Sequence, residues 1–419
     1  MLLSSYQNLN TVANITYSNT SWSKTCVIHR YNGNGQDSKM KGKWSVDRRT
    51  FIGTTAALTG SCLLGRRTSL FAGQESDFPA EYVVKLPDGR LQCGLCPNAC
   101  IPAEGENGNC RARGIRNGQF TSLVYGFPCV IAVDPVEKMP LFHYHVHGPA
   151  LSISTAGCNL VCQYCQNWQF SQKSPAETAN FAMSPADIVL RAVDMQLRTI
   201  GFFYTEPTIY IEYMKDVARL AKKSNIKTIM VTAGYINPEP LKDLFELIDM
   251  FVVGYKGFTE EFYAEAIGGK LESVKKALVS IKESGCHLEV VSLLIPGKND
   301  DMKVFQVGAE WFVEHLGPDV PWHFSRFLPE FLLKNLPPTP NGVLETARAI
   351  AIKAGVKFAY TGNNPGQEGN HTYCPGCGKK VVERLGFKVL RSFLSAGKCQ
   401  DCGYQIPGVW LDDLPNGNI

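Results

Sequence analysis

Between residues 150 and 365 the chain alternates short runs of apolar, β-branched residues with longer stretches in which apolar residues recur at helical spacing. The short runs predict buried strands, and the longer stretches predict amphipathic helices. The predicted strands are 151–154, 200–204, 227–232, 250–255, 287–295, 321–327 and 356–361. Ser184 followed by Pro185 marks the start of one of the helices. Repeated βα units build a parallel sheet, so we predict an α/β fold, a partial (β/α) barrel, for residues 150–365.

Three cysteines, Cys158, Cys162 and Cys165, follow the first predicted strand in the run CNLVCQYC. In a barrel of βα units the reactive residues lie on the loops after the carboxyl ends of the strands. Three thiolates can ligate three corners of a 4Fe-4S cluster, which leaves the fourth iron open to a small molecule. The alternative is a structural zinc site, which needs a fourth protein ligand. The nearest upstream histidine is His147, and none lies just downstream.

Two further cysteine groups stand at either end of the predicted barrel. The segment 80–149 contains Cys93, Cys96, Cys100 and Cys110 in a stretch rich in Gly, Pro and Asn. These four thiols predict a zinc site or a second iron-sulfur cluster, and metal-free buried thiols are the third possibility. Residues 371–410 contain two knuckles, CPGCG and CQDCG, with Cys374, Cys377, Cys399 and Cys402. This pattern predicts a zinc ribbon, with a rubredoxin-like iron site as the competing interpretation.

The other four of the fifteen cysteines, Cys26, Cys62, Cys129 and Cys286, show no spacing pattern and are interpreted as buried or adventitious thiols. The net charge of +4 is too small to indicate nucleic acid binding, so we expect no nucleic acid partner.

Residues 1–72 are interpreted as a leader. Arg48 and Arg49 precede the apolar stretch 51–65, which is shorter than a membrane-spanning helix, and Met40 is a possible true start. The pattern resembles a twin-arginine export signal, with Cys62 as a possible lipid anchor, and a disordered leader is the alternative. We predict membrane association through residues 40–72, although low-potential redox chemistry is expected mainly in the cytoplasm, so the side of the membrane stays open.

Polar side chains after later strands are further candidates for the site. Glu206, in Tyr204-Thr205-Glu206-Pro207, places a carboxylate on the loop after the second predicted strand, and complementing a helix dipole is its alternative role. His323 and Arg326 end a late strand and could reach a substrate. The alternating histidines at positions 143, 145 and 147 could share one face of a strand, but no second ligand set supports a metal there.

Taken together, the motifs resemble the AmmeMemoRadiSam system radical SAM enzyme family over residues 91–410, and more distantly the activating enzymes of pyruvate formate-lyase. The residues that carry the resemblance are Cys93 to Cys110, Asp134 to Lys138, Pro140 to His143, Cys158 to Asn167, Thr205 to Thr208, Ile295 to Asp300, Pro321 to His323, and the ribbon with Ile406 to Trp410.

The resemblance implies that S-adenosylmethionine (SAM) binds the open iron of a 4Fe-4S cluster and is reductively cleaved to a 5′-deoxyadenosyl radical. It places Tyr164, the aromatic residue before the third cysteine, and Glu206 at the SAM site. It implies an electron donor such as a ferredoxin or flavodoxin, and Memo-like and AMMECR-like proteins as possible partners. The substrate stays open. The alternatives are an activase of a glycyl-radical partner protein and a catalytically weakened iron-sulfur scaffold.

The chain departs from the family pattern at two positions. Ala233 stands where the family typically has Asn, and Gly254 stands where it has Asp. In the related activases an acidic side chain at the second position helps to hold a monovalent cation, and Lys256 close by would oppose such a cation. We therefore expect turnover to be insensitive to exchanging sodium for potassium, and Gly254→Asp to introduce sensitivity.

Overall fold

The computed structural model describes residues 14–16, 27–31, 37–38, 70–144 and 148–410. The chain divides into two units, residues 1–66 and 67–419. In the first unit β1 (Asn14–Thr16), β2 (Val27–Tyr31) and β3 (Asp37–Ser38) form an antiparallel sheet. The twin-arginine pair, Met40 and Cys62 lie outside the described residues. Within the described residues, no helix has both the length and the apolar character needed to cross a membrane.

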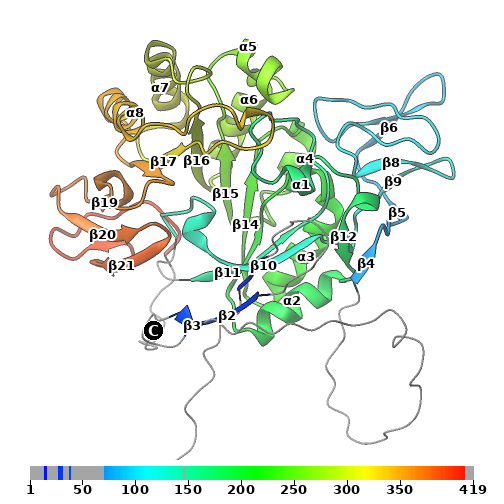
Figure 1. Cartoon of the computed structure of the whole chain (residues 1–419), viewed down its shortest axis with the longest axis horizontal. Coiled ribbons are helices and arrows are strands. Elements are labelled where there is room, and N and C mark those ends of the chain that lie inside the picture. The colour runs from blue at the N-terminus through cyan, green and yellow to red at the C-terminus, as the bar shows by residue number, and fades with distance from the viewer. Residues whose placement is uncertain (1–13, 17–26, 32–36, 39–69, 145–147, 411–419) are drawn as a thin grey trace, which may run out of the picture. The chain divides into compact units, whose positions relative to one another are not determined.

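An eight-stranded sheet forms the centre of the second unit, in the order β10-β11-β13-β14-β15-β16-β17-β18 (Figure 1). All neighbours from β11 onward pair in parallel, and β10 is antiparallel to β11. The strands are β10 (Val130–Pro135), β11 (Pro149–Ser154), β13 (Thr199–Phe202), β14 (Lys227–Thr232), β15 (Met250–Gly254), β16 (His287–Leu294), β17 (Trp322–Arg326) and β18 (Ala359–Gly362). The seven predicted strands are confirmed, and β10 was not predicted.

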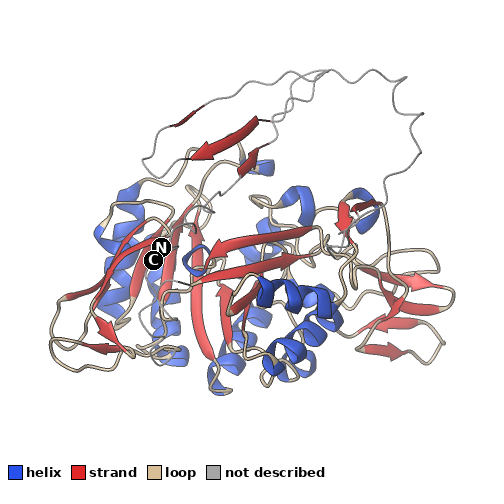
Figure 2. Cartoon of the chain, turned by 90° about the horizontal axis from the view of Figure 1, so that it is seen from below, coloured by secondary structure: helices blue, strands red, loops and turns tan. Residues whose placement is uncertain are grey.

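Helices connect the parallel strands and lie along the sheet, as Figure 2 shows. They are α1 (Trp168–Ser171), α2 (Pro185–Asp194), α3 (Ile211–Lys223), α4 (Pro238–Lys242), α5 (Glu260–Phe262), α6 (Leu271–Glu283), α7 (Met302–Leu316) and α8 (Asn341–Ala354), with a π-helix at Tyr263–Ile267. Short 3-10 helices span Val136–Lys138, Pro175–Glu177, Pro207–Tyr210, Phe331–Leu333 and Glu368–Asn370. Helix α2 begins as predicted, because the Ser184 side chain accepts a hydrogen bond from the Asp187 amide.

Strand residues point alternately to the helices and to the interior of the barrel. At the amino-terminal ends of the strands the interior is filled by a cluster of apolar side chains. It joins Val136, Met139, Leu141 and Tyr144 from the connection between β10 and β11 to Ile229, Met250 and Val252 of the barrel. Gly201 makes room for this cluster, since a Cβ there would clash with the Met139 side chain. The barrel is therefore closed at this end, and only the end with the strand carboxyl termini is available for a site.

Two small strand-rich segments flank the barrel on opposite sides in Figure 1. The N-terminal segment contains β5 (Phe78–Pro79), β6 (Val83–Lys85), β7 (Leu91–Cys93), β8 (Arg113–Arg116) and β9 (Gln119–Ser122). Just before it, β4 (Leu70–Ala72) pairs with β12 (Ala179–Phe181) of the barrel. The C-terminal segment contains β19 (Thr372–Tyr373), β20 (Lys380–Leu385), β21 (Lys388–Ser392), β22 (Leu394–Ser395) and β23 (Lys398–Cys399).

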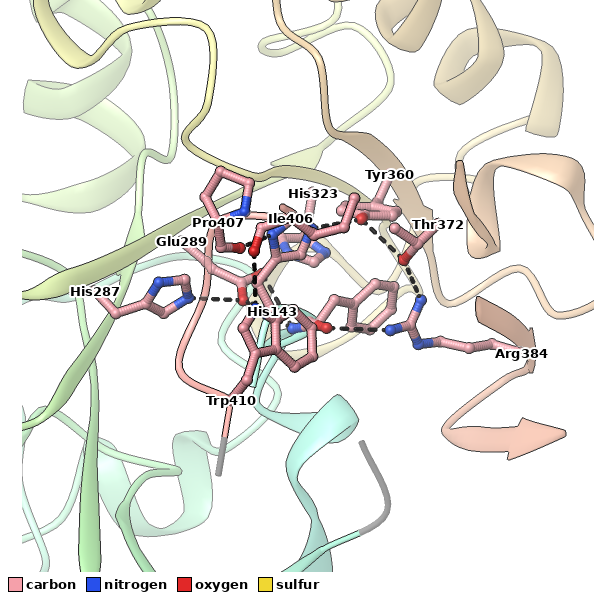
Figure 3. A network of polar contacts seen from close by, with 11 residues as sticks. His143, His287, Glu289, His323, Tyr360, Thr372, Arg384, Ile406, Pro407 and Trp410 are labelled. Carbon is pink, nitrogen blue, oxygen red and sulfur yellow. Dashed lines mark hydrogen bonds and ion pairs between the residues drawn. The ribbon is translucent and has the colours of Figure 1, made fainter. Parts of the chain in front are cut away.

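A buried carboxylate, Glu289 of β16, joins the barrel to the segment that precedes β11 (Figure 3). It accepts hydrogen bonds from the backbone amides of Phe142 and His143 at 2.9 and 2.6 Å. The ring nitrogens Nε2 of His287 and His323 lie 3.1 and 2.6 Å from its oxygens. Burial alone would raise the pKa of Glu289, but the hydrogen bonds from His287 and His323 outweigh it and hold that pKa well below 4.5.

A directed chain of hydrogen bonds continues from this carboxylate to the C-terminal segment (Figure 3). His143 Nδ1 lies 2.6 Å from the Pro407 carbonyl, which can only accept, so Nδ1 carries the proton. His143 Nε2 therefore accepts from the Tyr360 hydroxyl at 2.7 Å. Tyr360 in turn accepts from Thr372, which accepts from Arg384. Each donor in this chain has one acceptor, so the chain fixes how the ribbon and the C-terminal tail dock on the barrel.

Candidate active site

The three-cysteine loop follows β11, at the carboxyl end of the barrel strands as predicted. Its backbone is held from two sides. The amides of Val161 and Gln163 donate to the carbonyls of Ile267 and Ala266, and the Cys158 amide donates to the Cys110 carbonyl at 3.2 Å.

Gly157 permits the close contact between this loop and the N-terminal segment. Its φ of +96° favours glycine, and a Cβ there would clash with the Cys110 carbonyl oxygen. The local sequence therefore fixes where the three thiols stand.

The three thiols share one open cavity, of about 230 Å³, with residues from the ends of four barrel strands. Its walls are apolar on one side, where Phe203, Val231, Val291 and Leu293 contribute. Glu206, Thr232 and Lys256 supply polar groups.

Glu206 is buried and hydrogen-bonded at this cavity. Its Oε1 accepts from the Thr208 hydroxyl at 2.7 Å and the Thr232 hydroxyl at 2.6 Å, and its Oε2 accepts from the Ala233 amide at 2.7 Å. It also caps the short helix Pro207–Tyr210 by accepting from the Thr208 amide. Both predicted roles are thus compatible, because one carboxylate caps the helix and faces the cavity.

Lys256 places a positive charge beside the thiols. Its ammonium has no acidic partner among the described residues, and it lowers the pKa of Cys162, which burial nonetheless raises to about 11. Burial likewise raises the pKa of Cys158 well above 9.0. A thiol with a raised pKa stays protonated near neutral pH. A bound metal cation is therefore needed to keep these side chains as thiolates.

Gly254 and Lys256 are neighbours in space as well as in sequence. The position of a Cβ on Gly254 lies 3.2 Å from Lys256 Nζ. A carboxylate introduced at residue 254 would therefore pair with Lys256. The expectation that Gly254→Asp alone creates a cation site is revised accordingly.

Tyr204 has a left-handed backbone, with a φ of +74°, a conformation that favours glycine. Its hydroxyl donates to Asp134 at 2.7 Å and lies 2.9 Å from Lys138 Nζ, and Lys138 also pairs with Asp134 at 2.7 Å. The Asn167 side chain donates to the Tyr204 carbonyl at 2.7 Å. These partners hold the strained backbone, and the ring lines the cavity.

The C-terminal cysteines converge as a zinc ribbon requires. The ligand atoms of Cys374, Cys377, Cys399 and Cys402 all lie within 4.8 Å of one another, a separation suited to one metal ion. The Cys399 thiol has its pKa lowered to about 7, chiefly by the Cys402 backbone amide. The site can hold a metal, and its identity as zinc is a proposal.

Other predicted residues lie elsewhere. His323 contacts Glu289 and is absent from the cavity lining, and Arg326 donates to the Thr339 carbonyl at 2.9 Å. His143 is hydrogen-bonded in the network of Figure 3, while positions 145 and 147 lie outside the described residues. The sequence analysis missed Glu289, although a single acid inside an otherwise apolar strand is a signal for a buried polar network.

One comparison assigns part of this chain to a superfamily, and another finds related proteins that are uncharacterized. Residues 152–305 match the family model of the radical SAM superfamily. Uncharacterized protein MJ0808 of Methanocaldococcus jannaschii is 39% identical over 329 residues, which cover 78% of this chain and 98% of that protein. MJ0674 of the same organism is 24% identical over 289 residues, covering 64% and 76%. The chain belongs to the radical SAM superfamily.

Solved structures with a similar fold were also found. A domain of pyruvate-formate lyase-activating enzyme from Bacteroides vulgatus has a TM-score of 0.35 and 17% identity, covering 39% of this chain and 98% of that domain. Streptococcus suis SuiB bound to SAM has a TM-score of 0.39 and 14% identity, covering 54% and 52%.

Proposed function

We propose that this chain is an enzyme that cleaves SAM reductively and uses the resulting radical on a substrate bound in the cavity of the barrel. The observation that carries the proposal is that Cys158, Cys162 and Cys165 open onto the same cavity as Glu206 and Lys256. The established superfamily membership supports SAM-dependent radical chemistry in general. The AmmeMemoRadiSam subfamily, its Memo-like and AMMECR-like partners, and a ferredoxin or flavodoxin donor are parts of this proposal.

The donor set fits a 4Fe-4S cluster with one open iron. Among the described residues, only the C-terminal cysteines bring three or more metal-ligating atoms within 4.8 Å, so Cys158, Cys162 and Cys165 are spaced more widely. Thiolates that each bind a different iron stand further apart than thiolates that share one ion. Glu206 already accepts four hydrogen bonds and is not a fourth ligand. When bound, the cluster and SAM supply one-electron cleavage of the 5′-carbon–sulfur bond and a 5′-deoxyadenosyl radical.

The residues of the chain then have binding and shielding roles. Glu206 Oε2, which within the described part of the chain accepts only from the Ala233 amide, has room to accept from the SAM ammonium, and the unpaired Lys256 ammonium is available to the SAM carboxylate. Tyr164 is buried and lines the cavity, and its hydroxyl has no hydrogen-bond partner among the described residues, so we assign it a donor role toward the cofactor. The apolar wall at Phe203, Val231 and Val291 keeps water from the reacting centre.

We test the proposal by incubating the anaerobically reconstituted chain with SAM and dithionite and measuring 5′-deoxyadenosine. We expect product from the unaltered chain and from Cys286→Ala, whose half-buried thiol lies outside the cavity. The triple alanine variant of Cys158, Cys162 and Cys165 should form none. Product formation by the triple variant, or none by a chain loaded with iron, would contradict the proposal, and the second result would favour a non-catalytic scaffold.

A further inference from the structure

The four cysteines of the N-terminal segment line one small, largely enclosed cavity. Cys93 ends β7, Cys96 and Cys100 lie in the following loop, and Cys110 precedes β8. Three of them are buried, Cys100 is half-buried, and none forms a disulfide. Gly108 lies against Cys100, since a Cβ there would be 3.3 Å from its sulfur. The segment thus folds around its thiols.

The distances between the sulfur atoms differ between the two kinds of metal site that four cysteines can form. In a zinc site all four sulfurs surround one ion, as in the C-terminal ribbon, where the ligand atoms lie within 4.8 Å of one another. The four N-terminal cysteines are all described residues that line one cavity, yet no three of them meet that distance. The cysteines of the three-cysteine loop show the same wider spacing. Neither group therefore converges as closely as the ribbon does, and a cubane, whose thiolates bind different irons, accommodates that wider spacing.

We propose that Cys93, Cys96, Cys100 and Cys110 hold a second 4Fe-4S cluster, which passes electrons to the first. Four thiolates provide one ligand for each iron, so this cluster has no open iron for a substrate. Arg113 lines the same cavity, and its Nε has no hydrogen-bond partner among the described residues. Its guanidinium forms a buried ion pair with Glu212 at 2.5 Å, so the Nε–H group is the donor that remains for a cluster sulfur.

The two cysteine groups are in direct contact. The Cys158 amide donates to the Cys110 carbonyl at 3.2 Å, so one hydrogen bond connects a ligand of each group. Asn98, within the four-cysteine loop, donates through its side chain to the Asn159 carbonyl at 2.8 Å. Asn159 also donates to the Tyr235 carbonyl at 2.7 Å, which anchors this contact to the barrel. A cluster in the N-terminal segment is therefore adjacent to the cluster of the proposed SAM site.

The electron balance needs one external reductant. A low-potential one-electron donor, such as a reduced ferredoxin or flavodoxin, is oxidised and reduces the second cluster. That electron then moves to the first cluster and is consumed when the carbon–sulfur bond of SAM breaks into methionine and the radical. The relay role rests on the proposed function, whereas the identity of the metal does not.

The first experiment measures iron, sulfide and zinc in the full chain after anaerobic reconstitution. We expect about eight irons and eight sulfides per chain, because each cubane holds four of each, together with zinc in the ribbon. The triple alanine variant of Cys158, Cys162 and Cys165 should keep about half of the iron, with an electron paramagnetic resonance signal that SAM does not alter.

The results distinguish the two proposals. Complete loss of iron in the triple variant, with or without extra zinc, overturns the second cluster and leaves the proposed function standing. Full retention of iron in that variant supports a cluster at the N-terminal site and contradicts the proposed function.

The second experiment tests the relay with Cys93→Ala/Cys96→Ala, and Cys286→Ala is the matched control. The double variant should keep a SAM-sensitive signal, which shows that the barrel is folded. With dithionite it should form 5′-deoxyadenosine near the rate of the control, because a small reductant reaches the first cluster directly. With a reduced ferredoxin its rate should fall by roughly tenfold or more, since the relay is missing. Equal rates with the protein donor would overturn the relay.

Discussion

Replacing His143 by asparagine should make the free energy of unfolding less dependent on pH. The surroundings of His143 require its imidazole to be neutral. Nδ1 donates to Pro407 and Nε2 accepts from Tyr360, so a proton on Nε2 would face the hydroxyl hydrogen of Tyr360. Burial lowers the pKa of His143 from 6.5 to about 3. Glu289 opposes that shift, while His287 and Arg384 add to it.

The magnitude follows from linkage. A histidine whose folded pKa is depressed contributes stability that is present above the unfolded pKa of 6.5 and is lost as the pH falls toward 3. From pH 8 to pH 5 the unfolded chain gains almost one proton at this site and the folded chain gains almost none. His143 alone therefore lowers the free energy of unfolding by about 2 kcal/mol over that interval.

The assay compares urea unfolding of the parent and His143→Asn at pH 8.0 and pH 5.0 by intrinsic fluorescence. Asparagine retains a donor for Pro407 but cannot titrate, and it leaves Tyr360 without its acceptor. The variant should be less stable by about 1–3 kcal/mol at pH 8, and this gap should shrink by about 2 kcal/mol at pH 5. His315→Asn, at an exposed position of α7, is the control and should follow the parent. Parallel loss of stability in parent and His143→Asn would refute the reasoning.

Three further changes test the site and the ribbon. Gly157→Ala should displace the three-cysteine loop and cost about half of the reconstituted iron, whereas Gly342→Ala, with open space around its Cα, should cost none; equal iron contents would show that the loop tolerates a Cβ. SAM cleavage should not respond to exchanging sodium for potassium, and Gly254→Asp should create a response only together with Lys256→Met; strong potassium activation of the unaltered chain would place the cation elsewhere. Cys402→Ala should release zinc from the full chain and leave the iron spectrum unchanged, and finding iron in the ribbon would overturn the zinc proposal.

The barrel was predictable because its signals are local. Each parallel strand is buried on both faces, so it stands out as a short apolar run, and the observed strands agree with the predicted runs. Strand β10 was missed although Val130 to Val133 form such a run, because it lies ahead of the βα repeats and pairs antiparallel with β11. The hydrogen bonds of Glu289 to the Phe142 and His143 amides were missed for another reason, since these two residues are more than a hundred positions away in the sequence.

The candidate site was predictable where its reactive residues lie close together in the sequence. Cys158, Cys162 and Cys165 could be grouped from their spacing, and Glu206 from its place after a strand. Spacing along the chain did not decide between zinc and a cluster for Cys93 to Cys110, because both metals accept four thiolates. To distinguish zinc from a cluster, one needs the distances between the sulfurs. These depend on how the loop folds around the cavity that Phe120 and Ile209 also line.

The two ends of the barrel therefore have different tasks. At the carboxyl ends of the strands some polar groups, such as the Lys256 ammonium, have no protein partner among the described residues and are available to a ligand. The N-terminal segment also contacts the three-cysteine loop at this end. At the amino ends an apolar cluster fills the barrel, and the Glu289 network and Arg384 connect it to the ribbon. Acid should act first at the amino end, through His143, and loosen the ribbon before it disturbs the cavity. Hydrogen exchange at pH 5 that rises in 372–399 while 227–232 stays protected would show this order, and simultaneous exchange in both regions would show that the ends unfold together.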